Sequence, residues 1–211
     1  MLSRFSKLLE RKEGYILLVI ALISFVIYHG VSTTSQYSSL DSYYSQSVKW
    51  DTCYENFECA TFDVPIDYSD LGVGTFQISA LRYTARDQAH RIGSLIVNPG
   101  GPGASGVDYA YNAEYIFSPD ILDRYDIVGF DPRGVSRSAP IVCFNDQETD
   151  ANFASDSKPD NTAEFKQAIA DTKEFLRKCK NKNEHLTAFS TANAARDMDI
   201  LRAIVGDKKL N

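Results

Sequence analysis

A glycine-rich loop that follows a short apolar run is the stretch of this chain best suited to chemistry. Residues 94–97 read Ser-Leu-Ile-Val, and residues 98–103 read Asn-Pro-Gly-Gly-Pro-Gly. An apolar run of this length favours a strand buried on both faces. Glycines adopt backbone angles that other residues avoid, and they let another group approach the main chain closely. We therefore expect this glycine loop, residues 98–103, to present bare N–H groups to something negatively charged.

A second apolar run ends in another polar loop. Residues 125–131 read Tyr-Asp-Ile-Val-Gly-Phe-Asp, and residues 132–138 follow as Pro-Arg-Gly-Val-Ser-Arg-Ser. Residues 105–117 and 119–124 between the two runs are predicted to be helical. Strands that alternate with helices predict an α/β fold with a mainly parallel sheet.

One interpretation of the glycine loop is a dinucleotide-binding fingerprint. Gly101, Gly103 and Gly106 match G-x-G-x-x-G after a strand, and Asp131 ends the next strand, where a ribose-binding carboxylate could lie. Against this, Pro102 removes an N–H inside the loop. The apolar run at residues 15–28 also indicates export, and an exported domain has little access to nicotinamide cofactors. The loop is not a phosphate-binding P-loop, because no Lys-Ser/Thr follows it.

The other interpretation is an oxyanion hole, in which preorganised backbone N–H groups stabilise the charge that develops during acyl transfer. Residues 98–103 resemble the glycine-proline loop of the proline iminopeptidase and tripeptidyl aminopeptidase branch of the α/β-hydrolases. Residues 129–138 resemble the next motif of that branch, G-x-D-x-R-G-x-G-x-S, with Ser136 where the family usually has glycine. Weaker similarities lie in residues 50–68 and 191–206.

This resemblance implies an exported serine peptidase that releases short N-terminal peptides or single residues, with no cofactor and no metal. Gly101 is the position that it assigns to a backbone N–H donor of the oxyanion hole. Residues of the loop itself and of the segment at the end of the second strand are expected to support the loop: Gly100, Pro102, Gly103, Asp131 and Arg133. The last two are expected to be structural and to brace the loop.

The family also requires a G-x-S-x-G nucleophile, then an acid, then a histidine. The sequence contains no G-x-S-x-G, and its three histidines, His29, His90 and His185, are expected on the surface. We therefore predict no catalytic residue in this chain and interpret it as the N-terminal part of a longer enzyme that acts on peptides. The alternative is a non-catalytic, membrane-tethered binding or assembly protein built on half a hydrolase sheet.

The N-terminus carries the signs of export. Residues 1–14 form a basic flank expected in the cytoplasm, and residues 15–31 are predicted to be a signal anchor. The uncharged run is short for a span of about 20 residues. No A-x-A-like cleavage site follows, so we favour an uncleaved anchor over secretion after cleavage. Residues 32–47 are interpreted as a tether, and residues 48–211 as an incomplete, extracytoplasmic α/β-hydrolase domain.

The cysteines and the net charge limit the partners. In an exported protein, four cysteines suggest two disulfides. Sequence proximity favours Cys53–Cys59 and Cys143–Cys179, and four reduced cysteines are the alternative. Their spacing does not suit a metal site. A net charge of −6 argues against nucleic acid as the main partner.

Periodicity predicts the remaining elements. Residues 60–68 and 76–84 are expected to pair as an antiparallel hairpin, and residues 145–161 to form a loop. Two helices are predicted at residues 162–182 and 191–205, and the last four residues look like the start of a strand. The buried side of the first helix is predicted to hold Phe165, Ile169, Phe175, Leu176 and Cys179, and that of the second Ala194, Met198, Leu201 and Val205.

Overall fold

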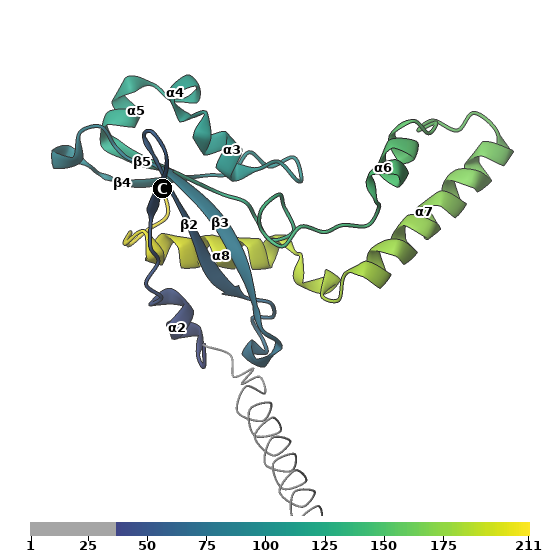
Figure 1. Ribbon diagram of the computed structural model, residues 1–211, viewed down its shortest axis with the longest axis horizontal. Helices are drawn as coiled ribbons and strands as arrows, with labels where there is room; N and C mark the ends of the chain where they lie inside the picture. The colour runs from purple at the N-terminus through teal and green to yellow at the C-terminus, as the bar shows by residue number, and fades with distance from the viewer. Residues whose placement is uncertain (1–36) are drawn as a thin grey trace, which may run out of the picture. The chain divides into compact units, whose positions relative to one another are not determined.

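Five strands form one sheet in the computed structural model, which describes residues 37–211 (Figure 1). The strand order within this part of the chain is β1-β2-β3-β5-β4. The strands are β1 (Asp51–Tyr54), β2 (Phe57–Pro65), β3 (Thr75–Tyr83), β4 (Gly93–Val97) and β5 (Tyr125–Phe130). The expected hairpin is confirmed, because β2 and β3 pair antiparallel along their whole length.

The prediction of a mainly parallel sheet is wrong for the described residues. Only β4 and β5 pair in parallel, and the other three neighbouring pairs are antiparallel. The physical reason is the number of crossovers. Two parallel strands need a crossover that returns the chain to the end of the sheet where the first strand began, and the helices between β4 and β5 provide it. The tight turn between β1 and β2 and the longer connection through residues 66–74 between β2 and β3 each reverse the chain.

The crossover consists of three short helices, α3 (Gly106–Tyr111), α4 (Ala113–Ile116) and α5 (Pro119–Arg124). The helix predicted at residues 105–117 is thus interrupted at Asn112. Two glycines set the distance between α3 and β5. A Cβ on Gly106 would lie 2.1 Å from the carbonyl oxygen of Phe130, and a Cβ on Gly129 would lie 2.0 Å from that of Gly106. Only glycines permit this approach.

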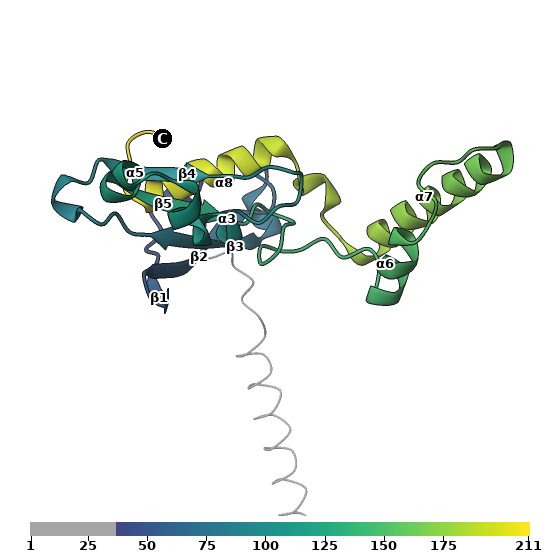
Figure 2. The ribbon, with the colours of Figure 1, turned by 90° about the horizontal axis from the view of Figure 1, so that it is seen from above.

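Each face of the sheet carries its own hydrophobic core. Successive side chains of a strand point to opposite faces, so Ile127 packs with α3 and α5 while Val128 packs with α8 (Thr191–Ile204) on the other side. Figures 1 and 2 show the helices of the crossover and α8 placed accordingly. The result is a three-layer arrangement, helix, sheet and helix, in which helices cover both faces of the sheet.

Residues 37–47, which we assigned to a tether, pack on the domain. They include α2 (Leu40–Tyr44), where Tyr43 is fully buried. The Tyr44 hydroxyl donates to Asp199 Oδ2 at 2.8 Å, and Gln46 exchanges two hydrogen bonds with the main chain of Asp63. Aromatic side chains supply enough apolar area to dock this segment. The rest of the tether and the predicted anchor at 15–31 lie outside the described residues. Within residues 37–211, no helix has the length and apolarity to span a bilayer.

An arm formed by α6 (Asp146–Phe153) and α7 (Thr162–Lys182) is set apart from the sheet in both views (Figures 1 and 2). The helix α6 lies in a segment that we predicted to be a loop. The Asn145 side chain caps it, and the Glu148 side chain completes a capping box. The helix α7 has the predicted bounds, but of its predicted buried side only Cys179 is buried.

Both predicted disulfides form. Cys53–Cys59 links β1 to β2, and Cys143–Cys179 links the start of the arm to the last turn of α7. Three 3-10 helices complete the described chain: η1 (Leu71–Val73), η2 (Gln88–His90) and η3 (Leu186–Ala188). The C-terminal residue of the described chain lies beside β4, where the Ile96 N–H donates to the carbonyl oxygen of Asn211 at 3.1 Å.

Candidate functional site

The glycine loop leaves the carboxyl end of β4 in a conformation that only glycine adopts without strain. Gly100, Gly101 and Gly103 have φ angles of +76°, +122° and +96°. Two hydrogen bonds hold the loop internally. The Gly100 N–H donates to Asn98 Oδ1 at 3.0 Å, and the Ala104 N–H donates to the carbonyl oxygen of Gly100 at 3.2 Å. The bond from Gly101 to Pro102 is cis.

The N–H of Gly101 is the candidate donor. Gly101 is exposed, and no hydrogen bond among residues 37–211 engages its N–H group. Its neighbour Pro102 has no N–H to offer. The loop therefore holds a backbone donor without a hydrogen-bond partner among the described residues, and oxyanion stabilisation uses donors of this kind.

The carboxylate of Asp131, at the end of β5, ties the strand to the segment that follows the glycine loop. Its side chain is fully buried. Oδ1 accepts hydrogen bonds from the Ser105 hydroxyl and, at 3.2 Å, from the Val107 N–H. Oδ2 accepts from the Arg137 N–H at 3.1 Å. With both oxygens engaged and no exposed surface, Asp131 does not face a ribose, so the dinucleotide interpretation loses its acidic residue.

Arg133 does not contact the glycine loop, to which we assigned it as support. Its buried guanidinium makes a bidentate ion pair with Asp197 of α8, at 2.6 and 2.7 Å. It also donates to the carbonyl oxygens of Pro65, Ile66 and Ala188. Arg133 thus joins the end of β2 to α8. Fork-shaped donors suit such planar, bidentate contacts.

Asp197 is a buried partner that the sequence prediction missed. It lies on the same side of α8 as Leu201, and Tyr68 donates to its Oδ1 at 2.7 Å. Burial raises the pKa of the Asp197 carboxyl, whereas the hydrogen bonds from Arg133 and Tyr68 lower it. The signal was available in the helical spacing, since an acid on the apolar face of a helix needs a buried partner.

The serines and histidines of the chain show no nucleophile and base pair in the described part. Ser138 is fully buried, and its hydroxyl accepts a hydrogen bond from the Ser79 N–H at 2.9 Å. His90 pairs with Asp87, and His185 lies 4.0 Å from Glu184. His29 is outside the described residues. No group of His, Cys, Asp and Glu within residues 37–211 could hold a metal ion.

Comparison with known proteins finds relatives over most of the chain. It is 32% identical to serine protease Hip1 of Mycobacterium tuberculosis over 177 residues, which are 78% of this chain and 34% of that protein. It is 33% identical to the tripeptidyl aminopeptidase of Streptomyces lividans over 175 residues, 78% of this chain and 32% of the relative. A carboxylesterase B of Mycobacterium tuberculosis is 37% identical over 169 residues.

The relatives are matched over only part of their own length. The chain spans about a third of the length of the relatives it matches. No family model matches the chain. The names of these relatives agree with the resemblance indicated by the motifs at residues 98–103 and 129–138. Over about a third of their length, the chain is thus similar to proteins named as a serine protease, a tripeptidyl aminopeptidase and a carboxylesterase, which is consistent with the α/β-hydrolase serine peptidase type.

Proposed function

We propose that this chain is the oxyanion-loop part of an extracytoplasmic serine peptidase that releases residues or short peptides from the N-terminus of its substrate. The observation that carries the proposal is the N–H of Gly101, an exposed residue, which no hydrogen bond among residues 37–211 engages. It lies in a loop with three left-handed glycines, at the carboxyl end of β4. In α/β-hydrolases one oxyanion donor comes from such a loop, and the other follows the nucleophile.

The nucleophile, the acid and the base would come from polypeptide outside these 211 residues. Two observations support this part of the proposal. The sequence has no G-x-S-x-G, and the chain spans about a third of the length of relatives named as peptidases and an esterase. A hydrolase without its serine and histidine loses nucleophile and base together, so this chain alone should bind substrate weakly and turn over none.

The location of the domain is a second part of the proposal. Both disulfides favour an oxidising compartment outside the cytoplasm. The basic flank at 1–14 and the uncharged run after it favour anchoring in a membrane by residues 15–31. Secretion after cleavage of that segment is the alternative.

The test uses the product of the native gene read beyond Asn211. It is incubated with a peptide that has a free N-terminus and with the same peptide N-acetylated, and the fragments are identified by mass. Release of short N-terminal fragments from the free peptide alone supports the proposal. Cleavage of neither peptide, or a stop codon directly after Asn211, would overturn it. The 211-residue chain is the matched control and should release nothing.

A further inference from the structure

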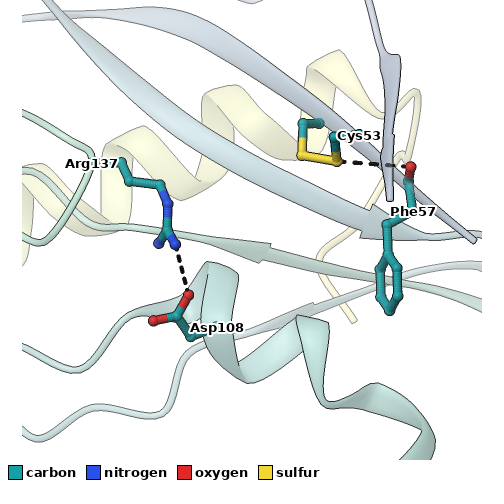
Figure 3. The surroundings of a disulfide bond; sticks show 5 residues. Cys53, Phe57, Asp108 and Arg137 are labelled. Atoms are coloured by element: carbon teal, nitrogen blue, oxygen red, sulfur yellow. Dashed lines mark hydrogen bonds and ion pairs between the residues drawn. A yellow bond between two sulfur atoms is a disulfide. The ribbon is translucent and has the colours of Figure 1, made fainter. Parts of the chain in front are cut away.

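A surface arginine adds to the contacts by which Asp131 ties the segment after the glycine loop to the end of β5. Arg137 Nη2 donates to Asp108 Oδ1 in the first turn of α3 at 2.9 Å (Figure 3). Its Nη1 lies 3.3 Å from Asp131 Oδ2 and 3.3 Å from the Ser105 hydroxyl. One side chain therefore bridges two carboxylates that belong to different elements.

These contacts close a ring. The Ser105 hydroxyl donates to Asp131 and accepts from the Asp108 N–H at 3.0 Å, so it both caps α3 and joins β5. Arg137 completes the circuit from Asp108 back to Asp131. Ser105 is only two residues beyond Gly103. The ring thus fixes the carboxyl-terminal end of the glycine loop, whereas β4 fixes its amino-terminal end.

The loop needs such support because its own bonds are few. It is held internally by the two hydrogen bonds of Asn98 and Gly100, and its glycines lose more conformational freedom on ordering than other residues would. An oxyanion donor acts only when it is held at the position where charge develops. The carboxylates of Asp131 and Asp108 lie where the loop joins α3, and the guanidinium between them offsets their negative charge.

We propose that Arg137 is a positioning residue that orders the glycine loop and offsets the charge of Asp131 and Asp108 for the reaction. The role of Arg137 in the reaction rests on the proposed function, whereas its role in ordering the loop does not. Arg137 touches neither Gly101 nor any reacting atom, so its role is exerted through Asp131, Ser105 and Asp108. Its side chain is 48% exposed, which limits its contribution to overall stability.

The chain offers a matched control. The side chain of Arg86 is 44% exposed, and it forms an ion pair with Asp123 at 2.7 Å. It also donates to the carbonyl oxygen of Pro119, so it ties the segment after β3 to α5 and makes no contact with the glycine loop. Arg86→Ala therefore removes an ion pair of similar exposure from an unrelated place.

The first arm measures amide hydrogen exchange in the 211-residue chain. The reporters are the N–H groups of Ala104, Val107 and Asp108, which are hydrogen-bonded within or beside the ring. In Arg137→Ala we expect their exchange to be roughly tenfold faster, because local opening becomes easier. Arg137→Lys keeps the charge and should restore part of the protection. Arg86→Ala should leave all three rates unchanged. Unchanged rates in Arg137→Ala would overturn the proposal.

The second arm measures kinetics in the longer gene product. Arg137→Ala should lower kcat roughly tenfold with KM unchanged, since the loop acts on the transition state. Arg137→Lys should recover part of kcat, and Arg86→Ala should match the wild type. A loosened loop with full kcat would overturn the catalytic role. Failure of the proposed function is distinguishable, because the wild-type longer product would then itself be inactive. In that case the role of Arg137 in the reaction would be overturned too, whereas faster amide exchange in Arg137→Ala would still support its role in ordering the loop.

Discussion

At the end of β5, neighbouring residues of one motif have different partners. Asp131 faces the root of the glycine loop, whereas Arg133 turns to the opposite side of the sheet and pairs with Asp197 of α8. The motif is therefore a junction that fixes a loop on one side and a helix on the other. Asp131 and Arg133 are both buried, and the hydrogen bonds that each of them makes offset the cost of that burial.

The buried pair of Arg133 and Asp197 predicts a large loss of stability when one partner is removed. Arg133→Met should lower the free energy of unfolding by about 3–5 kcal/mol, because Asp197 is left buried without a counter-charge. The control is Arg177→Met. Arg177 pairs with Glu174 at the same distance, 2.6 Å, but is 60% exposed, and its loss should cost far less stability than the loss of Arg133. Urea denaturation measures both, and equal costs would contradict the account.

Gly101 predicts a loss of activity that strain alone does not explain. Gly101→Ala places a side chain at φ +122°, and Gly206→Ala places one at φ +81° after α8. Both substitutions strain the backbone. In the longer gene product, only Gly101→Ala should lower kcat, by roughly a hundredfold, because it displaces an oxyanion donor. Similar kcat values for the two variants would show that the glycine loop is not the oxyanion hole.

At the scale of elements, the sequence predicted local structure better than pairing. The hairpin of β2 and β3, the strands β4 and β5 and the bounds of α7 follow from apolar patterns and caps. Proximity of the cysteines predicted both disulfides. The parallel sheet was wrong because an apolar run looks the same whichever neighbour it pairs with.

Only those parts of the candidate site that lie in recognisable motifs could be predicted from the sequence. Residues 98–103 and the position of Asp131 were found because glycines and a strand-end acid are visible in the sequence. The partner of Arg133 was missed, since Asp197 lies 64 residues further on. Arg137 was missed because its two carboxylates come from different elements. Helical spacing indicates that Asp197 is buried and needs a partner, but the identity of a partner that is distant in the sequence leaves no periodic pattern.

The two long helices differ in their packing, and the same substitution separates them. Ile169 of α7 is 42% exposed, whereas Ile200 of α8 is fully buried. Periodicity indicates an apolar face but not whether another element covers it. Ile200→Ala should lower the free energy of unfolding by about 2–5 kcal/mol, and Ile169→Ala by less than about 1 kcal/mol. Urea denaturation of the two variants checks this, and a large cost at Ile169 would mean that α7 is covered.

For the whole molecule, burial of tyrosines predicts sensitivity to alkali. Burial, and next the charge of Asp197, raise the pKa of Tyr68 well above its ordinary value of 10.0. Below pH 10 the hydroxyl is protonated in both states. As the pH rises further, only the unfolded chain releases the proton, so the free energy of unfolding falls.

The variant Tyr68→Phe isolates this group. Its free energy of unfolding should fall less steeply between pH 10 and pH 11, by about one proton's contribution. Tyr37, Tyr44 and Tyr83, whose pKa values are also raised, contribute to the remaining slope. Denaturation at several alkaline pH values measures the slopes, and identical slopes in the wild type and the variant would rule out the assignment.

The most direct test of the central claim is labelling with a fluorophosphonate, which reacts with activated serines. The claim is that these 211 residues supply an oxyanion loop and that the nucleophile lies elsewhere in the enzyme. The account predicts that the longer gene product is labelled at one serine outside residues 1–211. The heat-denatured product and the 211-residue chain alone should remain unlabelled. Labelling of the 211-residue chain, at Ser136 or any other serine, would contradict the claim.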